Sequence, residues 1–234
     1  MSRTLIITGG SRGIGLATCR YFAEQGYRVI NLSRSPAPLQ QTVNIAVDLA
    51  EPGWPERHGP ALLEAAGADR QITLIHNAGL TMNDSVTNLD AATLRRVLQI
   101  NLVAPAQLNR LMLPHMDEDS SILYVGSTLS EKAVAGSCSY ITSKHALVGL
   151  MRATCQDLAG RKIHTACVCP GFTDTEMLRE HVGESGEALK SIASGVTFNR
   201  LIEPSEIAAT LYFCARNPVI NGAVIHANLG QVER

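Results

Sequence analysis

Residues 5–23 read LIITGGSRGIGLATCRYFA. Residues 5–7 form a short apolar run, residues 8–15 form a glycine-rich turn, and the apolar residues that follow recur at helical spacing. A strand, a glycine turn and a helix N-terminus make a site for an anion, because backbone N–H groups and the helix dipole converge there and glycine lets the backbone approach. The spacing is T-G-x-x-x-G-x-G, and taken alone it is also compatible with a simple tight connection between a strand and a helix.

Strand-like and helix-like patterns alternate along the rest of the chain. Several of the strand-like runs are continuously apolar, as strands covered on both faces of a parallel sheet are. The pattern predicts an α/β fold, a single domain over residues 1–234 with a doubly wound (Rossmann) parallel seven-stranded sheet, helices on both faces and ligands at the carboxyl ends of the strands. The expected strands are 5–8, 28–32, 43–47, 72–77, 122–126, 163–169 and 223–226, and the expected helices are 16–25, 55–66, 91–116, 140–158 and 205–214.

Tyr140 and Lys144 lie four residues apart in a run that reads as helix. Residues at that spacing share one face, and a nearby cation favours the phenolate and lowers the pKa of a tyrosine. The pair is therefore a candidate acid/base, although the same spacing is common for surface residues of an amphipathic helix. Ser127, at the end of an apolar run, precedes Tyr140 by thirteen residues.

Six motifs follow one another in order: Thr8-Gly9-x-x-x-Gly13-x-Gly15, Asn77-Ala78-Gly79, Asn101, Ser127, Tyr140-x-x-x-Lys144 and Pro170-Gly171. Together they resemble the motifs of the short-chain dehydrogenase/reductase superfamily, over about residues 5 to 230.

The resemblance implies four catalytic residues and hydride transfer between a nicotinamide and a carbinol carbon. In the reductive direction, Tyr140 would protonate the developing alkoxide and Ser127 would donate a hydrogen bond to the carbonyl oxygen. Lys144 would lower the phenol pKa and hold the nicotinamide ribose. Asn101 matches the residue whose side chain supports a water and proton path behind Lys144, but an Asn buried in a helix is also commonly a local hydrogen-bonding residue.

The resemblance also implies a set of cofactor contacts along the carboxyl edge of the sheet. They comprise the glycine turn, the ends of the second and third strands, the segment closing under the ribose, and the segment beside the nicotinamide. The residues are Gly9, Ser11, Arg12, Gly13, Ile14, Gly15, Ser33, Arg34, Asp48, Leu49, Asn77, Ala78, Gly79, Tyr140, Lys144, Pro170, Gly171, Phe172, Thr173 and Thr175.

The choice between NAD and NADP is argued from the end of the second strand. NAD-selective sheets usually place a carboxylate there, which would repel a 2′-phosphate. Here the strand ends in Ser33-Arg34 with no acid, and Arg12 could reach the same place. Two guanidiniums would hold the phosphate by charge-assisted hydrogen bonds. We therefore expect NADP(H), with NAD(H) as the alternative if both arginines are ordinary surface residues.

Substrate identity is less specific. Residues 170–177 and 199–208 look most like the 3-oxoacyl-acyl-carrier-protein reductase branch of the superfamily, while Asn228-Leu229-Gly230 replaces the Gly-Gly pair usual in that branch. The expectation is an NADPH-dependent carbonyl (ketone or 3-oxoacyl) reductase. The alternatives are an NAD-linked alcohol dehydrogenase working oxidatively and a non-catalytic NADP(H)-binding sensor. Residues 174–200 stand where the family carries its substrate lid, or form an ordinary surface helix hairpin.

Composition limits the partners and the setting. Charged residues make up 18% of the chain and the net charge is −1, so neither nucleic acid nor a membrane is indicated as a partner. The histidines show no metal-ligand pattern, and there is no C-x-x-C. The apolar runs are too short to span a membrane. We expect a cytoplasmic enzyme with six free cysteines, Cys167 and Cys169 pointing to one face of a strand, and a small-molecule carbonyl substrate that an acyl thioester could carry.

Assembly is expected from the resemblance. The helices corresponding to residues 91–116 and 140–158 usually form a two-fold four-helix interface in this superfamily, and the last strand forms another. Val148, Leu150 and Met151 would supply apolar surface for the first of these. The expected assembly is a homotetramer, or a homodimer.

Overall fold

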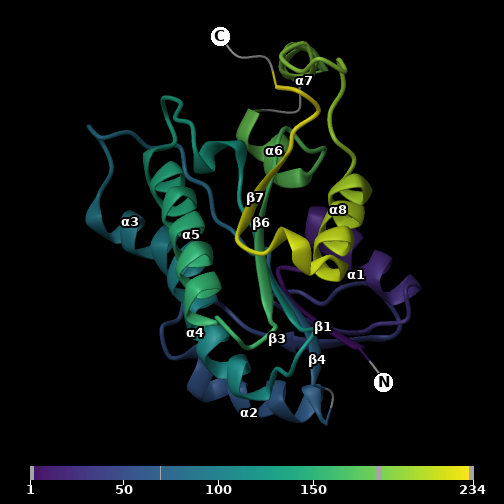
Figure 1. Cartoon of the computed structure of the whole chain (residues 1–234). Helices are drawn as coiled ribbons and strands as arrows, with labels where there is room; N and C mark the ends of the chain where they lie inside the picture. The colour runs from purple at the N-terminus through teal and green to yellow at the C-terminus, as the bar shows by residue number, and fades with distance from the viewer. Residues whose placement is uncertain (1–2, 69, 183–185, 232–234) are drawn as a thin grey trace.

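Seven parallel strands form one sheet in the computed structural model, which describes residues 3–68, 70–182 and 186–231 (Figure 1). The strand order is β3-β2-β1-β4-β5-β6-β7, so the chain winds outward from β1 and then restarts at β4 on the other side of β1. In sheets of this kind ligands bind outside the carboxyl ends of the strands at that reversal. The strands are β1 (Arg3–Thr8), β2 (Arg28–Ser33), β3 (Thr42–Ala46), β4 (Gln71–His76), β5 (Ser121–Val125), β6 (His164–Pro170) and β7 (Ala223–Ala227).

The central strands are buried on both faces. Every residue of β5 and β6 is buried, and so is every residue of β1 and β4 except the first. This explains their continuously apolar sequences, because each face of the sheet needs apolar side chains to pack against helices. The predicted doubly wound seven-stranded fold is confirmed, with each strand boundary within two residues of its expected position.

Helices cover both faces of the sheet (Figure 1). One apolar cluster joins α2, α4 and α5 to the sheet, and the other joins α1 and α8 to the opposite face. The helices are α1 (Gly13–Glu24), α2 (Trp54–Ala66), α3 (Ala91–Leu98), α4 (Ala104–Met112), α5 (Cys138–Asp157), α6 (Glu176–Val182), α7 (Gly186–Ala193) and α8 (Pro204–Arg216).

The expected single helix over residues 91–116 is wrong. A π-helical turn, Gln99–Val103, separates α3 from α4, and a 3₁₀ turn, Leu113–His115, follows α4. Pro105 has no N–H to donate to the carbonyl of Asn101 four residues earlier, so one regular α-helical hydrogen bond is missing there. The N–H of Ala104 instead reaches back five residues to the carbonyl of Gln99. Single π-helical turns of this kind often occur at functional sites.

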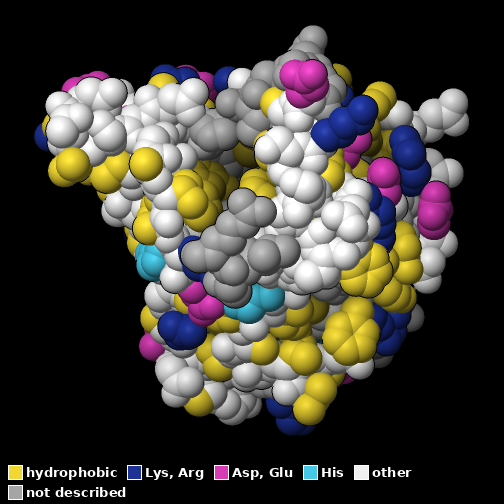
Figure 2. Space-filling view, turned by 90° about the horizontal axis from the view of Figure 1, so that it is seen from above, with side chains coloured by type: hydrophobic (Ala, Val, Ile, Leu, Met, Phe, Trp, Pro, Cys, Tyr) yellow, Lys and Arg dark blue, Asp and Glu magenta, His cyan; other side chains and the backbone are white. Residues whose placement is uncertain are grey.

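Helices α6 and α7 lie beyond the carboxyl ends of the strands, at the top of Figure 1. Figure 2, viewed from above, shows hydrophobic side chains around a hollow on this side of the molecule. Residues 183–185, in the middle of the expected lid, lie outside the described residues. Of the helices that the structure describes, none combines the length and the apolar character that crossing a membrane requires.

Candidate active site

The glycine turn between β1 and α1 is closely packed. Gly9 and Gly13 have positive φ angles of 70° and 53°, which glycine adopts without a steric penalty. A Cβ at Gly15 would lie 2.1 Å from the carbonyl oxygen of Gly9, so no other residue fits without moving the backbone. Ser11 and Ile14 are half-buried in the same turn. The turn thus points the N-terminus of α1 at the carboxyl edge of the sheet.

Asn77, directly after β4, fastens the neighbouring segment to this turn. Its Nδ2 donates to the carbonyl oxygens of Thr8 and Gly9, each at 3.0 Å. The backbone N–H groups of Asn77 and Ala78 both donate to the Thr8 hydroxyl, at 3.1 and 3.0 Å. The expected ribose segment and the expected phosphate turn are therefore brought together at the reversal of strand order.

The end of β2 is held by Asn31, a residue that was not among the expected cofactor contacts. Asn31 is buried, and its Oδ1 accepts from the N–H of Gly10 at 2.8 Å while its Nδ2 donates to the hydroxyl of Ser33 at 2.9 Å. A polar amide inside the apolar run VINL was the available signal, because a buried amide needs partners. Asn31 connects the glycine turn with the end of the second strand.

The two arginines expected at the second-strand end differ in their contacts. Arg34 follows β2 directly and is exposed, and its guanidinium has no hydrogen bond or ion pair within the described part of the chain. Arg12 donates to the Glu180 carboxylate of α6 at 3.0 Å, with both side chains more than half exposed. The interaction connects the glycine turn to the segment that follows β6.

Ser127, Tyr140 and Lys144 gather at the carboxyl end of β5. Ser127 follows that strand and caps a 3₁₀ turn, Thr128–Ser130, its Oγ accepting from the N–H of Leu129 at 3.1 Å. That turn packs against α5, which carries Tyr140 and Lys144. The ammonium of Lys144 is buried, donates to the carbonyl of Val125 at 2.7 Å and lies 5.5 Å from the centroid of the Tyr140 ring. The phenol therefore has a fixed cation beside it.

Asn101 lies in the π-helical turn and is buried. Its Oδ1 accepts from the N–H of Leu80 at 2.8 Å, and its Nδ2 donates to the Leu80 carbonyl and to the Ser143 hydroxyl, both at 2.9 Å. These contacts connect the π-helical turn to the segment after β4 and to α5. A Cβ placed on Gly79 would lie 3.7 Å from the Lys144 nitrogen and 3.9 Å from Asn101 Oδ1, so Gly79 leaves space in front of both groups.

Residues 170–175, at the end of β6 and just after it, also lie at the carboxyl edge of the sheet. Pro170 ends β6, and a Cβ on Gly171 would lie 2.9 Å from the Cα of Asn228, so the chain passes tightly beside the end of β7. Thr173 is buried and pairs with Ile202, and Thr175 lies against the glycine turn, its Cγ2 3.2 Å from the place of a Cβ on Gly13. Phe172, in this segment, is half-buried.

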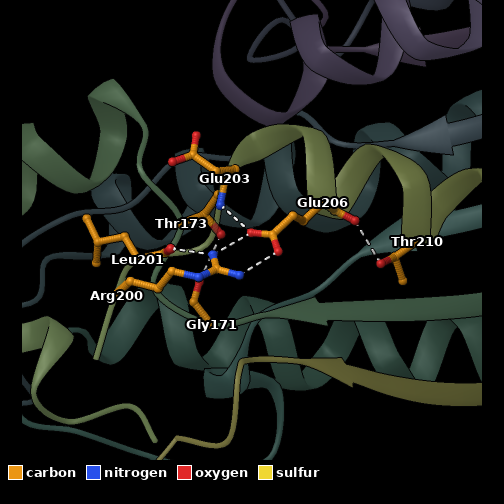
Figure 3. A network of polar contacts seen from close by, with 7 residues as sticks. All are labelled: Gly171, Thr173, Arg200, Leu201, Glu203, Glu206 and Thr210. Atoms are coloured by element: carbon orange, nitrogen blue, oxygen red, sulfur yellow. Dashed lines mark hydrogen bonds and ion pairs between the residues drawn. The ribbon is translucent and has the colours of Figure 1, made fainter. Parts of the chain in front are cut away.

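An ion pair between Arg200 and Glu206 lies at the start of α8, close in the chain to Ile202, which pairs with Thr173 (Figure 3). Both terminal guanidinium nitrogens of Arg200 donate to the Glu206 carboxylate at 2.7 Å, and Glu206 also accepts from the N–H of Glu203. Arg200 and this N–H lower the pKa of Glu206 to about 2. The carboxylate therefore remains charged over the physiological pH range.

The third-strand end contributes a tight turn. The Asp48 carboxylate accepts from the N–H of Ala50 at 2.9 Å, and Leu49 is buried. The side chain of Gln99 donates to the Leu49 carbonyl at 3.3 Å. Asp48 and Leu49, two of the expected cofactor contacts, thus lie at the same edge of the sheet as the glycine turn.

All six cysteines are free thiols, and Cys167 and Cys169 point to one face of β6, as expected. Their sulfurs are 3.8 Å apart. The hydrogen bond between them lowers the pKa of Cys169 and raises that of Cys167. Within the described residues, no group of three or more His, Cys, Asp or Glu side chains could hold a metal ion.

Comparison with known proteins gives consistent relatives. A family model described as enoyl-(acyl carrier protein) reductase matches residues 9–231. Carbonyl reductase family member 4 of Danio rerio is 27% identical, over 96% of this chain and 96% of that protein. The 3-oxoacyl-(acyl-carrier-protein) reductase FabG of Vibrio cholerae is 27% identical, over 97% and 96%. A solved structure of a 3-oxoacyl (acyl-carrier-protein) reductase from Agrobacterium tumefaciens with NADP bound has a TM-score of 0.86 and 25% identity, over 97% of this chain and 93% of that one.

Proposed function

The chain belongs to the short-chain dehydrogenase/reductase family of oxidoreductases, and from this premise we propose that it is an NADPH-dependent carbonyl reductase that converts a ketone to a secondary alcohol. The observation that carries the proposal is the position of Tyr140. Its ring lies 5.5 Å from a buried ammonium, on a helix packed against the turn that begins at Ser127. A phenol beside a fixed cation can release a proton to a developing alkoxide, because the cation stabilises the phenolate that remains.

The residues at the carboxyl edge fit a nicotinamide dinucleotide. The N-terminus of α1 and the glycine turn suit a pyrophosphate, and Gly79 leaves space before Lys144 and Asn101. The reduced nicotinamide would supply a hydride to the carbonyl carbon. Ser127 would donate a hydrogen bond to the carbonyl oxygen, Tyr140 would deliver the proton to it, and Lys144 would hold the ribose. The exposed Arg34, with no acid beside it, supports NADP(H) over NAD(H).

The substrate class is proposed from the relatives. The Vibrio cholerae and Agrobacterium tumefaciens proteins are named as reductases of 3-oxoacyl groups on acyl carrier protein, and the Danio rerio protein as a carbonyl reductase. We therefore propose a small ketone or a 3-oxoacyl thioester as substrate, and residues 174–200 as the lid over it. A cytoplasmic homotetramer or homodimer is the proposed form of the enzyme.

A substrate screen with paired tyrosine variants tests the function. Purified protein is mixed with NADPH or NADH and with 3-oxoacyl thioesters, quinones and simple ketones, and cofactor oxidation is followed. We expect turnover with NADPH, a fall of roughly 10²–10⁴ in kcat for Tyr140→Phe, and an unchanged affinity for NADPH. The control is Tyr21→Phe, which removes a hydroxyl from a ring packed on Tyr212 in α8. A Tyr140→Phe enzyme with near-normal turnover would mean that another group delivers the proton.

A further inference from the structure

The helix that carries Tyr140 lacks a cap of its own. Tyr140 is the third residue of α5, and Ser137 at the N-cap position makes no side-chain hydrogen bond to the first-turn N–H groups. The first turn of α5 also contains no acidic residue. Unsatisfied N–H groups at a helix start favour fraying, and a suitable acceptor stabilises the first turn. The position of Tyr140 therefore depends on a partner from elsewhere in the chain.

Asp84, in the segment after β4, is that partner. Its carboxylate accepts from the backbone N–H of Ser139 at 2.9 Å and from the Ser139 hydroxyl, and the side chain is buried. Its backbone is fixed as well, because its N–H donates to the Gly136 carbonyl at 3.1 Å and its carbonyl accepts from the N–H of Cys138 at 3.2 Å. A carboxylate at this place also interacts favourably with the positive end of the helix dipole.

Tyr140 follows Ser139 directly, and a second set of hydrogen bonds holds its backbone carbonyl. The carbonyl of Tyr140 accepts from the Ser143 hydroxyl at 2.7 Å, and Ser143 accepts from the amide of Asn101. Asn101 in turn bonds both backbone groups of Leu80, four residues before Asp84. Residues 80–84 thus bind the backbone around Tyr140 at two places. Asp84 binds Ser139 directly, and Leu80 is connected to the Tyr140 carbonyl through Asn101 and Ser143.

We infer that Asp84 is a positioning residue for catalysis, which caps α5 from the preceding segment and holds the Tyr140 hydroxyl where a substrate carbonyl receives its proton. The inference rests on the proposed role of Tyr140 as proton donor. We propose no contact of Asp84 with substrate or cofactor. It acts through Ser139, and a displacement of about 1 Å in a reacting group can cost about 10²-fold in rate.

The variant Asp84→Asn distinguishes a role of Asp84 in positioning the helix from a role of its negative charge. The amide oxygen of an Asn can still accept from the N–H of Ser139, and its NH₂ group can donate to the Ser139 hydroxyl. If Asp84 acts by position, Asp84→Asn keeps kcat within about threefold of wild type, while Asp84→Ala loses about 10- to 100-fold. The KM for NADPH should change by less than about threefold in either variant, because Lys144 keeps its own contact with Val125.

The experiment measures kcat, KM and thermal unfolding for Asp84→Ala, Asp84→Asn, Ser139→Ala and the double alanine variant. The substrate is the 3-oxobutanoyl thioester of N-acetylcysteamine, or the best ketone of the screen if that thioester is not turned over. We expect Ser139→Ala to lower kcat by about 3- to 10-fold and the double variant to fall little below Asp84→Ala, since the two residues act as one unit. Ser139→Ala keeps the test valid if Asp84→Ala fails to fold.

Asp90 provides a matched control. It caps α3 from its own N-cap position, where its carboxylate accepts from the N–H groups of Ala92 and Thr93 at 2.8 Å, and that turn carries no candidate catalytic residue. Asp90→Ala should lower the melting temperature and leave kcat unchanged. The inference is overturned if folded Asp84→Ala keeps kcat within twofold, if Asp84→Asn falls as far as Asp84→Ala, or if the effects of Asp84→Ala and Ser139→Ala multiply independently.

Tyr140→Phe in the same assay separates the two proposals. Retained turnover in Tyr140→Phe refutes the proposed function itself. Lost turnover in Tyr140→Phe together with normal turnover in Asp84→Ala refutes only the positioning role.

Discussion

Replacement of Arg34 by Ala tests cofactor selectivity most directly. If the exposed guanidinium binds the 2′-phosphate, its removal deletes a charge-assisted hydrogen bond worth about 1.5–3 kcal/mol. That loss corresponds to an increase of about 10- to 150-fold in the Kd for NADPH. NADH has no 2′-phosphate, so its Kd should change by less than about twofold.

Arg12 should contribute less than Arg34 because it already has a partner. Its ion pair with Glu180 lies at the surface, with side chains 52% and 64% exposed, and such pairs are worth about 0–1 kcal/mol. Binding a phosphate must break or share that pair. Arg12→Ala should therefore weaken NADPH less than Arg34→Ala, and Glu180→Gln should tighten NADPH by up to about fivefold.

The assay is a fluorescence titration of NADPH and NADH at two salt concentrations, since the arginine contribution should shrink with screening. Arg28→Ala is the control, because Arg28 is an exposed arginine at the opposite end of the same strand and changes the net charge equally. If the wild-type protein binds NADH at least as tightly as NADPH, then Arg34 and Arg12 do not hold a 2′-phosphate as proposed.

Three further outcomes are expected. Lys144→Ala should lose both turnover and NADPH affinity, and adding Tyr140→Phe to it should lower kcat little further, as steady-state kinetics can show. Burial lowers the pKa of His76 from 6.5 to about 4. As the pH falls below 6.5, the unfolded chain therefore binds a proton at this histidine before the folded chain does. The free energy of unfolding should fall by about 3 kcal/mol between pH 6.5 and pH 4. Urea unfolding at several pH values checks this, and an equally steep loss in His76→Gln would contradict it. Sedimentation at micromolar concentration should give a tetramer or dimer, and a monomer would refute the proposed assembly.

The fold was predictable because its signals are local. Buried parallel strands need continuous apolar runs, which the sequence shows. The glycine turn after the first strand identifies the first strand–turn–helix unit of the doubly wound sheet. The motifs at Ser127, Tyr140 and Lys144 come together because they stand at one end of two adjacent elements, β5 and α5.

Contacts set by tertiary structure were not predictable in the same way. Nothing near Asp84 in the sequence indicates that it caps a helix 55 residues away, and nothing near Arg12 indicates Glu180 as its partner. The helix expected over residues 91–116 was mistaken only in part for this reason, because Asn101 bonds a distant residue but Pro105 was a local signal in the sequence. Its apolar spacing is helical throughout, whereas the interruption arises where Pro105 removes a donor and Asn101 bonds Leu80.

In the segment from the π-helical turn to the end of α4, the number of residues is as constrained as the kinds of residues. Each residue of an α-helix advances the side chains by about 100° around the axis. Deleting one residue between Val103 and Leu108, just beyond the π-helical turn, would rotate the rest of α4 by about that angle relative to α3. Leu108 and Met112, now fully buried, would then turn away from the core. Natural insertions and deletions in this protein should therefore avoid residues 99–112 and collect in the surface loops.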